Sequence, residues 1–341
     1  MKASMLVWLR ISAIAIGACA CIGIAAVWLN SSPAPRVGEP KLFAIQKGES
    51  LSGISQRLQK DGLIRFAPLL DLLGRLRGTA GSVKAGYFRL PPGVTMIRIH
   101  DILVAGSQSL EKVTIPEGWT LRKIALHLES LGVCLAVDFI SAASSEELSD
   151  KLRAGQDGLE GYLFPDTYLV PRPFAAEAMV ELMVRAFFAA LDQIAPEHTQ
   201  MSPRALRDKV IVASIIEREY RLASEAPIIA SVFYNRLRWN IGLESCATLE
   251  YIITEIQQKA HPEYITLEDK RLDSPYNTYM WAGLPPGPIS NPGKIALDAA
   301  FHPARTDFMY FVLRDRDTGR HYFSEDLNEH NQAKYLYLKK P

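Results

Sequence analysis

Hydrophobic and polar positions divide the chain into an apolar start, a repeated middle and a helical second half. Residues 11–29 read "ISAIAIGACACIGIAAVWL" and carry no charge, which is about the length that an α-helix needs to cross a bilayer core. Lys2 and Arg10 precede this run, and Trp28 lies near its end, as expected for a span with its N-terminus in the cytoplasm. We therefore predict a single transmembrane helix.

Two other roles of this apolar run stay open at the level of sequence. A cleaved signal peptide would have a shorter apolar core and a small-residue exit, and "IGAC" ending at Cys19 is similar to a lipoprotein cleavage box. The run continues well beyond Cys19, which favours an uncleaved anchor. The Pro- and Ser-rich stretch over residues 31–40 then predicts a linker. We expect a protein of the cell inner membrane whose bulk is periplasmic.

A pattern of glycine, hydroxyl and apolar positions occurs twice. The stretches "IQKGESLSGISQRLQKDGLI" and "IPEGWTLRKIALHLESLGVC" align 70 residues apart. In each copy a short strand should end at a glycine turn, Ser50 or Thr120 should cap a helix, and apolar residues recur at helical spacing. Gly62 and Gly132 then suit a left-handed helix end. The repeat predicts two strand–turn–helix units.

Other elements follow from the same reasoning. Residues 83–95, "VKAGYFRLPPGVT", predict a strand pair around a Pro-Pro-Gly turn. In the second half, residues 175–191 have the period of an amphipathic helix. Residues 203–220 follow a capping Ser202 and open with a proline, which is typical of a helix start. A further helix should begin near Ser224.

These elements predict an α+β protein in five parts. They are a cytoplasmic tip with the transmembrane helix (1–30), the linker (31–40), a small α/β subdomain (41–110), a second repeat or connecting unit (111–155), and a larger mixed α+β catalytic domain (156–341).

Composition excludes several classes of protein. The chain has 341 residues, 48% of them hydrophobic, and a formal net charge of +1, so nothing indicates a nucleic-acid partner. Outside the apolar run only Cys134 and Cys246 remain, too few for a disulfide framework and not spaced as zinc ligands. The histidines are scattered without a metal-binding motif. We expect neither a metal nor a cofactor.

The stretch "VIVASIIEREY" contains the clearest candidate for chemistry. Val210, Ala213 and Glu217 lie on one face of the predicted helix, so Glu217 extends a buried apolar face. Burial raises the pKa of a carboxyl group, and a carboxyl group still protonated near neutral pH can act as a general acid. A buried ion pair, with Arg236 or Arg238 as the partner, or a frayed helix end stays an alternative. Glu219 points the opposite way and should be solvated or paired, with a helper role in substrate binding as the alternative.

Several stretches closely resemble the endolytic murein transglycosylase family, also called YceG-like: "EGYLFPDTY", "ASIIERE", "ASVFYNRL", "SPYNTYMWAGLPPGPISNPG", "AAFHPARTDFMYFV" and "HYFSEDLNEHN". The resemblance implies a membrane-anchored enzyme that cuts peptidoglycan glycan strands internally, with Glu217 at the position of the catalytic glutamate. It also implies a reaction in which a single carboxyl group serves as the acid and the C6 hydroxyl of the substrate serves as the nucleophile. The products of such a reaction carry 1,6-anhydro-N-acetylmuramic ends. Nascent strands are the expected substrate, and peptidoglycan synthases are candidate partners.

The first copy of the repeat is similar to a LysM module, a small unit that commonly binds glycans containing N-acetylglucosamine. A spacer or stalk without glycan binding stays an equal alternative. The second copy departs from the pattern at Pro116 and Trp119.

Further site candidates follow from the resemblance and from residue chemistry. Tyr276, Asn277 and Thr278 carry neutral polar groups suited to a sugar, and Asn235 on the helix after Glu217 faces either the cleft or a neighbouring helix. Where the family runs roughly "LQSDPT", this chain reads "LESCAT", which retains Thr248 but replaces Asp-Pro by Cys-Ala.

Two other functions stay open. A non-catalytic peptidoglycan-binding scaffold would use the anchor and the repeat equally well. A hydrolase would need a second carboxylate, for which Glu244 and Glu250 are the candidates nearest in sequence to the changed loop.

Overall fold

The computed structural model describes residues 25, 28, 30–31, 40–46, 48–106, 110–151 and 158–338. The predicted transmembrane helix and linker lie almost wholly outside these residues, so both stay predictions. No helix within the described ranges has the length and apolar character needed to cross a membrane.

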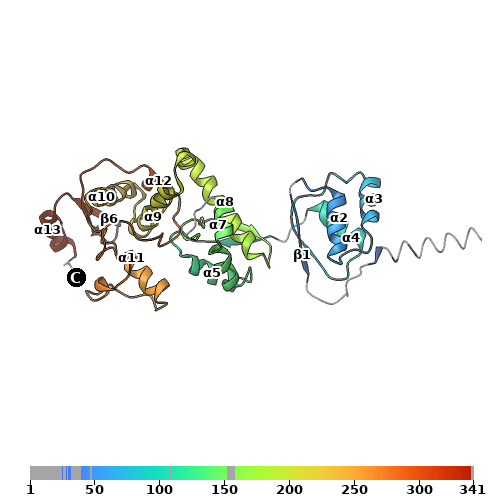
Figure 1. Cartoon of the computed structure of the whole chain (residues 1–341), viewed down its shortest axis with the longest axis horizontal. Helices are drawn as coiled ribbons and strands as arrows, with labels where there is room; N and C mark the ends of the chain where they lie inside the picture. Colours follow the sequence, from blue (N-terminus) through green and yellow to red (C-terminus); the bar gives the residue numbers. More distant parts are fainter. Residues whose placement is uncertain are drawn as a thin grey trace, which may run out of the picture. The chain divides into compact units, whose positions relative to one another are not determined.

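Contacts between Cα atoms divide the chain into two compact units, Met1–Glu111 and Lys112–Pro341 (Figure 1). Each unit has its own helices and small sheets, and the mixed α+β class predicted from the sequence is confirmed.

The first unit arranges three helices around a two-stranded sheet. β1 (Lys41–Ile45) and β2 (Gly86–Leu90) are antiparallel, with Lys41 opposite Leu90. The helices are α2 (Leu51–Lys60), α3 (Ala67–Leu76) and α4 (Met96–Ala105). All five elements contribute to one apolar core, whose fully buried members include Ile54, Leu58, Leu70, Phe88 and Ile99.

The strand–turn–helix repeat is confirmed in both copies. Ser50 caps α2 by accepting a hydrogen bond from the Gly53 N–H, and Thr120 caps α5 (Leu121–Ser130) by accepting one from the Lys123 N–H. Gly62 and Gly132 follow the two helices with φ of 70° and 68°, a left-handed conformation that favours glycine. The local sequence therefore determines the same strand–turn–helix structure in both copies.

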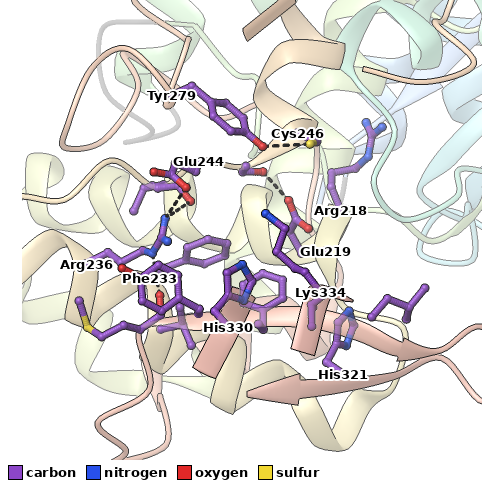
Figure 2. A pocket seen from close by; sticks show the side chains of 18 of the residues that line it. Arg218, Glu219, Phe233, Arg236, Glu244, Cys246, Tyr279, His321, His330 and Lys334 are labelled. Carbon is purple, nitrogen blue, oxygen red and sulfur yellow. Dashed lines mark hydrogen bonds and ion pairs between the residues drawn. The ribbon is translucent and has the colours of Figure 1, made fainter. Parts of the chain in front are cut away.

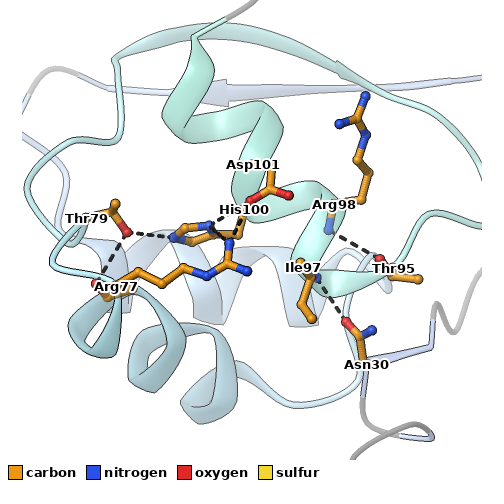
Figure 3. Close-up of polar contacts among 9 residues, drawn as sticks. Asn30, Arg77, Thr79, Thr95, Ile97, Arg98, His100 and Asp101 are labelled. Atoms are coloured by element: carbon orange, nitrogen blue, oxygen red, sulfur yellow. Dashed lines mark hydrogen bonds and ion pairs between the residues drawn. The ribbon is translucent and has the colours of Figure 1, made fainter.

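The predicted strand pair around the Pro-Pro-Gly turn is wrong. Only its first half is a strand, and that strand pairs with β1. After the turn, Thr95 accepts a hydrogen bond from the Arg98 N–H and begins α4 (Figure 3). Ile99 and Leu103 are buried one helical turn apart, so helical burial of this face decides the conformation.

A small polar cluster joins α4 to the loop after α3. The His100 side chain is 2% exposed, and its Nε2 lies 2.8 Å from the Thr79 hydroxyl. Arg77 donates to the Asp101 carboxylate at 2.7 Å on the same side (Figure 3). The cluster satisfies a buried imidazole that would otherwise be costly inside a core.

The second unit is mainly helical. Its helices are α5, α6 (Ala136–Ala143), α7 (Glu146–Lys151), α8 (Ala176–Ile194), α9 (Pro203–Glu219), α10 (Ala226–Arg238), α11 (Cys246–Tyr251), α12 (Lys294–Phe301) and α13 (Leu327–Leu338). β3 (Glu111–Thr114) pairs with β4 (Thr167–Val170), and β5 (Tyr310–Asp315) pairs with β6 (Arg320–Ser324) in an antiparallel hairpin.

Helix α9 lies at the centre of this unit. It packs against α12, α10 and α11, while α13 covers the β5–β6 hairpin (Figure 1). Residues Ile211–Ile216 are all buried, so α9 is surrounded by protein until its last turn. The two candidate site residues, Glu217 and Glu219, lie in that last turn.

Candidate active site

Glu217 occupies the last turn of α9, as the sequence pattern predicted. Ser202 caps the start of the helix by accepting from the Ala205 N–H, and proline occupies its first turn. The apolar residues before Glu217 are buried, whereas Glu217 itself is half-buried. The helix therefore holds a carboxyl group at the border between the core and the solvent.

The Glu217 carboxyl group is fixed from one side. Its Oε2 accepts a hydrogen bond from the Gly293 N–H at 2.9 Å, just before α12 begins. The side chain also passes close to Gly118, in the turn between β3 and α5. Neither Arg236 nor Arg238 contacts it: Arg236 donates to backbone carbonyls and Arg238 to Asn235. The ion-pair alternative is therefore wrong.

The electrostatic setting suits a proton donor. Burial raises the pKa of Glu217 to about 7; the Gly293 hydrogen bond and the Arg218 charge oppose this effect, and the Glu117 carboxylate adds to it. A carboxyl group with this pKa exchanges a proton near neutral pH. Because Oε2 accepts from Gly293, the proton of the neutral acid belongs on Oε1.

Sequence reasoning missed Glu117. This exposed residue lies in the β3–α5 turn, and its carboxylate lies against Gly293, the residue that binds Glu217. The only signal in the sequence was the second copy of the repeat, where Glu117 stands at the position of Lys47 in the first. Glu117, not Glu244 or Glu250, is the carboxylate that acts on the pKa of Glu217.

Asn291 holds the β3–α5 turn beside the acid. Its backbone carbonyl accepts from the Gly118 N–H at 3.0 Å, and its own N–H donates to the Trp119 carbonyl at 2.8 Å. Its side chain is fully buried. The Oδ1 atom accepts from the Gly161 and Leu163 N–H groups, both at 2.9 Å. One asparagine thus joins three segments that are distant in sequence.

Glu160 completes this support. Its carboxylate accepts from the Leu121 N–H at 2.9 Å and from Asn291 Nδ2 at 2.8 Å. Burial raises the pKa of Glu160 to about 8, and those two hydrogen bonds oppose the rise. Glu160 and Asn291 were not predicted as site residues, because their partners lie far away along the chain.

Glu219 lies on the other side of α9. It accepts a hydrogen bond from the Ser245 hydroxyl at 2.5 Å, and burial raises its pKa. It is therefore a paired, half-buried carboxylate rather than a solvated one. Glu219 lines a cavity of about 440 Å³ between the ends of α9 and α10, the 243–246 loop, β5 and α13 (Figure 2). Glu217 is not among the residues lining this cavity.

Asn235 faces its neighbours in the fold. Its Nδ2 donates to the carbonyl oxygens of Thr306 at 2.8 Å and Phe308 at 2.9 Å. The adjacent Arg236 donates to the Met309 carbonyl at 2.7 Å. Both side chains tie α10 to the segment that leads into β5.

Of the other predicted substrate-binding residues, Thr278 supports the 243–248 loop, to which Thr248 belongs. The Thr278 hydroxyl accepts from the Ser245 N–H at 3.1 Å and lies 3.0 Å from the Thr248 hydroxyl. Asn277 is fully buried and donates to the Leu272 carbonyl at 2.8 Å. Tyr276 is half-buried, with its ring centroid 5.1 Å from that of Tyr251. Hydrogen bonds thus connect Thr248 and Thr278 to Ser245, which donates to Glu219, and a sugar-binding role for these residues stays a prediction.

The changed loop carries a free thiol. Cys246 Sγ lies 3.1 Å from the Tyr279 hydroxyl, and neither Cys246 nor Cys134 is in a disulfide. Across the described part of the chain, no group of three or more histidine, cysteine, aspartate and glutamate residues is placed to hold a metal ion.

Fold and site together define a class: a mixed α+β protein whose central helix presents, in its last turn, a half-buried carboxyl group with a pKa of about 7. The model of the YceG-like family matches residues 43–335, and the chain belongs to this family.

Two relatives and one solved structure are consistent with membership of this family. An endolytic murein transglycosylase of Bacillus subtilis (strain 168) is 29% identical over 310 residues, covering 86% of this chain and 84% of that protein. One of Streptococcus pneumoniae (serotype 2, strain D39) is 28% identical over 317 residues, covering 84% of this chain and 56% of that protein. The crystal structure of a yceG-like protein from Listeria monocytogenes superimposes with a TM-score of 0.57 at 30% identity, covering 87% of this chain and 99% of that one.

Proposed function

We propose that this protein is a peptidoglycan lytic transglycosylase that cuts glycan strands internally between N-acetylmuramic acid and N-acetylglucosamine. The observation that carries the proposal is Glu217: a half-buried acid with a pKa of about 7, held by the Gly293 N–H, in a chain of the YceG-like family. The relatives are endolytic murein transglycosylases, which supports the substrate and the reaction.

The proposed reaction needs one carboxyl group. Glu217 donates the proton on Oε1 to the glycosidic oxygen as the bond from C1 to that oxygen breaks. The C6 hydroxyl of the same N-acetylmuramic acid attacks C1, and its proton passes to the Glu217 carboxylate. A 1,6-anhydro ring forms, no water is consumed, and Glu217 regains the proton for the next turnover.

Glu117 is the residue on which the competing hydrolytic route would depend. Hydrolases pair the acid with a second carboxylate that acts as nucleophile or activates water. Glu250 is engaged by Arg218 at 2.6 Å, and Glu244 lies 3.6 Å from Arg236, so neither is directed at Glu217. In the transglycosylase proposal Glu117 instead acts on the pKa of Glu217.

Digestion of purified peptidoglycan followed by mass spectrometry tests the proposal. The expected new ends are lighter than reducing ends by one water and resist borohydride. Reducible ends would make the protein a hydrolase, with Glu117 as its second carboxylate. An intact substrate would favour the scaffold alternative.

We also propose that the protein is anchored in the inner membrane by residues 11–29, acts on nascent strands and works beside peptidoglycan synthases. The charge-free run and the basic residues before it support the anchor. The resemblance of the first unit to a LysM module supports glycan binding by that unit.

A further inference from the structure

The cavity on the Glu219 side of α9 has features of a ligand site that the proposed reaction does not use. Its floor includes the half-buried apolar side chains of Met309, Phe311 and Leu313. Its volume of about 440 Å³ lies in the range of small-molecule sites, which combine an apolar lining with a few placed polar groups.

Cations dominate the rim of this cavity. Arg221, Lys270 and Lys334 line it and form no ion pair with a carboxylate anywhere in the described parts of the chain. Figure 2 shows the Lys334 side chain directed into the same space as Glu219. By contrast, Arg218 is paired with Glu250 at 2.6 Å. Uncompensated cations beside a half-buried surface attract an anionic ligand.

The carboxylates of the cavity do not neutralise these cations. Glu219 is held by Ser245, and burial raises its pKa, which disfavours its charge. Glu244 is 50% exposed and lies 3.6 Å from Arg236. A further polar atom lies in the wall of the cavity. Nδ1 of His330 is buried and has no hydrogen-bond partner in the described structure. The cavity therefore offers several donors and an apolar floor to one ligand.

The cavity lies beside the proposed acid. Glu217 and Glu219 are two positions apart on one helix, so their side chains leave α9 on roughly opposite sides. Arg218 stands between them; it lines the cavity and its side chain also passes close to Gly118 in the turn next to Glu217. A short peptide attached to a sugar at Glu217 could reach around Arg218, because five extended residues span about 17 Å.

We propose that this cavity binds the carboxylate-bearing peptide stem of peptidoglycan. The inference rests on the proposed function, which supplies the substrate class. The glycan strand itself is neutral between its substituents, whereas the stem carries carboxylates and small aliphatic side chains. Those two features match the cationic rim and the apolar floor. Recognition of the stem positions the strand while Glu217 acts on the glycosidic bond.

Binding of a muramoyl pentapeptide to the full-length protein in detergent tests the inference without cleavage, since this ligand has no glycosidic bond to cut. Isothermal titration calorimetry should detect binding that weakens as salt rises. Lys334→Ala should weaken it by about tenfold or more, the effect of losing one hydrogen bond to a charged group, and Lys334→Glu should weaken it further. The same peptide with its carboxylates converted to amides should bind much less.

Arg204→Glu is the control for the change of charge, because Arg204 is exposed in the first turn of α9, at the opposite end of that helix from the cavity, and should leave binding unchanged. The inference is overturned if the pentapeptide does not bind, if Lys334→Glu binds it like the unmodified protein, or if the amidated peptide binds equally well. Pyrophosphate that binds more tightly than the peptide and displaces it would instead identify a phosphate ligand. Cleavage of strands by a protein that fails these tests would leave the proposed function standing.

Discussion

At the scale of single residues, the site depends on the difference between two glutamates in one helical turn. Glu217→Gln should fold normally and lose cleavage by about 10²–10⁴-fold, the contribution of a general acid, because an amide cannot donate and then accept the proton. Glu219→Gln should keep most activity, since its amide oxygen can still accept from Ser245. Measured rates of strand cleavage by the two variants test this prediction. Equal losses of activity would refute the assignment of the acid to Glu217.

Glu117 should control the pH dependence of that acid. The acid must be protonated, and its pKa is about 7, so cleavage should fall as pH rises through about 7. Burial is the main cause of that raised pKa and the Glu117 charge adds to it. Glu117→Gln removes the charge, lowers the pKa of Glu217 and should therefore move the alkaline limb of kcat/KM to lower pH.

Glu147→Gln is the control, because Glu147 is exposed on α7. This variant should leave the alkaline limb of kcat/KM in place. A limb that stays fixed or moves to higher pH in Glu117→Gln would contradict the role of Glu117. Loss of cleavage at every pH, without a shift, would indicate a direct chemical role for this carboxylate instead.

At the scale of elements, the two copies of the repeat share a backbone but differ in their surroundings. Gly118 has φ of 72° and Gly48 has φ of 85°, a region that other residues enter at a cost of about 1–2 kcal/mol. A Cβ on Gly118 would lie 3.5 Å from Glu217 Cγ and 3.4 Å from Arg218 Cδ, whereas one on Gly48 would meet nothing within 4 Å. The glycine turn of the second copy therefore borders Glu217, whereas that of the first copy has no such neighbour.

We therefore expect Gly118→Ala and Gly48→Ala to lower stability similarly but to differ in activity. Both should lose about 1–2 kcal/mol of folding free energy, measured by denaturant unfolding. Only Gly118→Ala should also lose cleavage, because its added Cβ would be in van der Waals contact with Glu217 and Arg218, so that strain at its positive φ acts on the turn beside the acid. If the two variants cleave strands at the same rate, the turn does not position the acid.

At the scale of the whole molecule, the prediction concerns topology. Lys2 and Arg10 before the apolar run and the polar stretch after it predict that the chain beyond about residue 30 is exported. A reporter fused after Pro341 should behave as periplasmic, and the protein should stay with the inner membrane after washing at high salt. A cytoplasmic reporter, or a chain shortened near residue 20, would show that residues 11–29 are not an uncleaved anchor.

The sequence by itself determined the elements whose causes are local. The caps at Ser50, Thr120 and Ser202, the glycine turns of the repeat and the buried face of α9 all follow from residues within a few positions of one another. Glu217 could be found for the same reason, because it continues an apolar helical face. The strand predicted after the Pro-Pro-Gly turn failed where packing of α4 on a distant core outweighed the local turn signal.

Only the tertiary structure decided what surrounds the acid. Gly293 reaches Glu217 across 76 positions, and the Asn291 side chain reaches Trp119 across 172. Glu117, Glu160 and the cationic cavity likewise owe their roles to contacts between distant segments. Such contacts leave no period or spacing in the sequence, because hydrogen bonds and burial depend on where the chain returns in space.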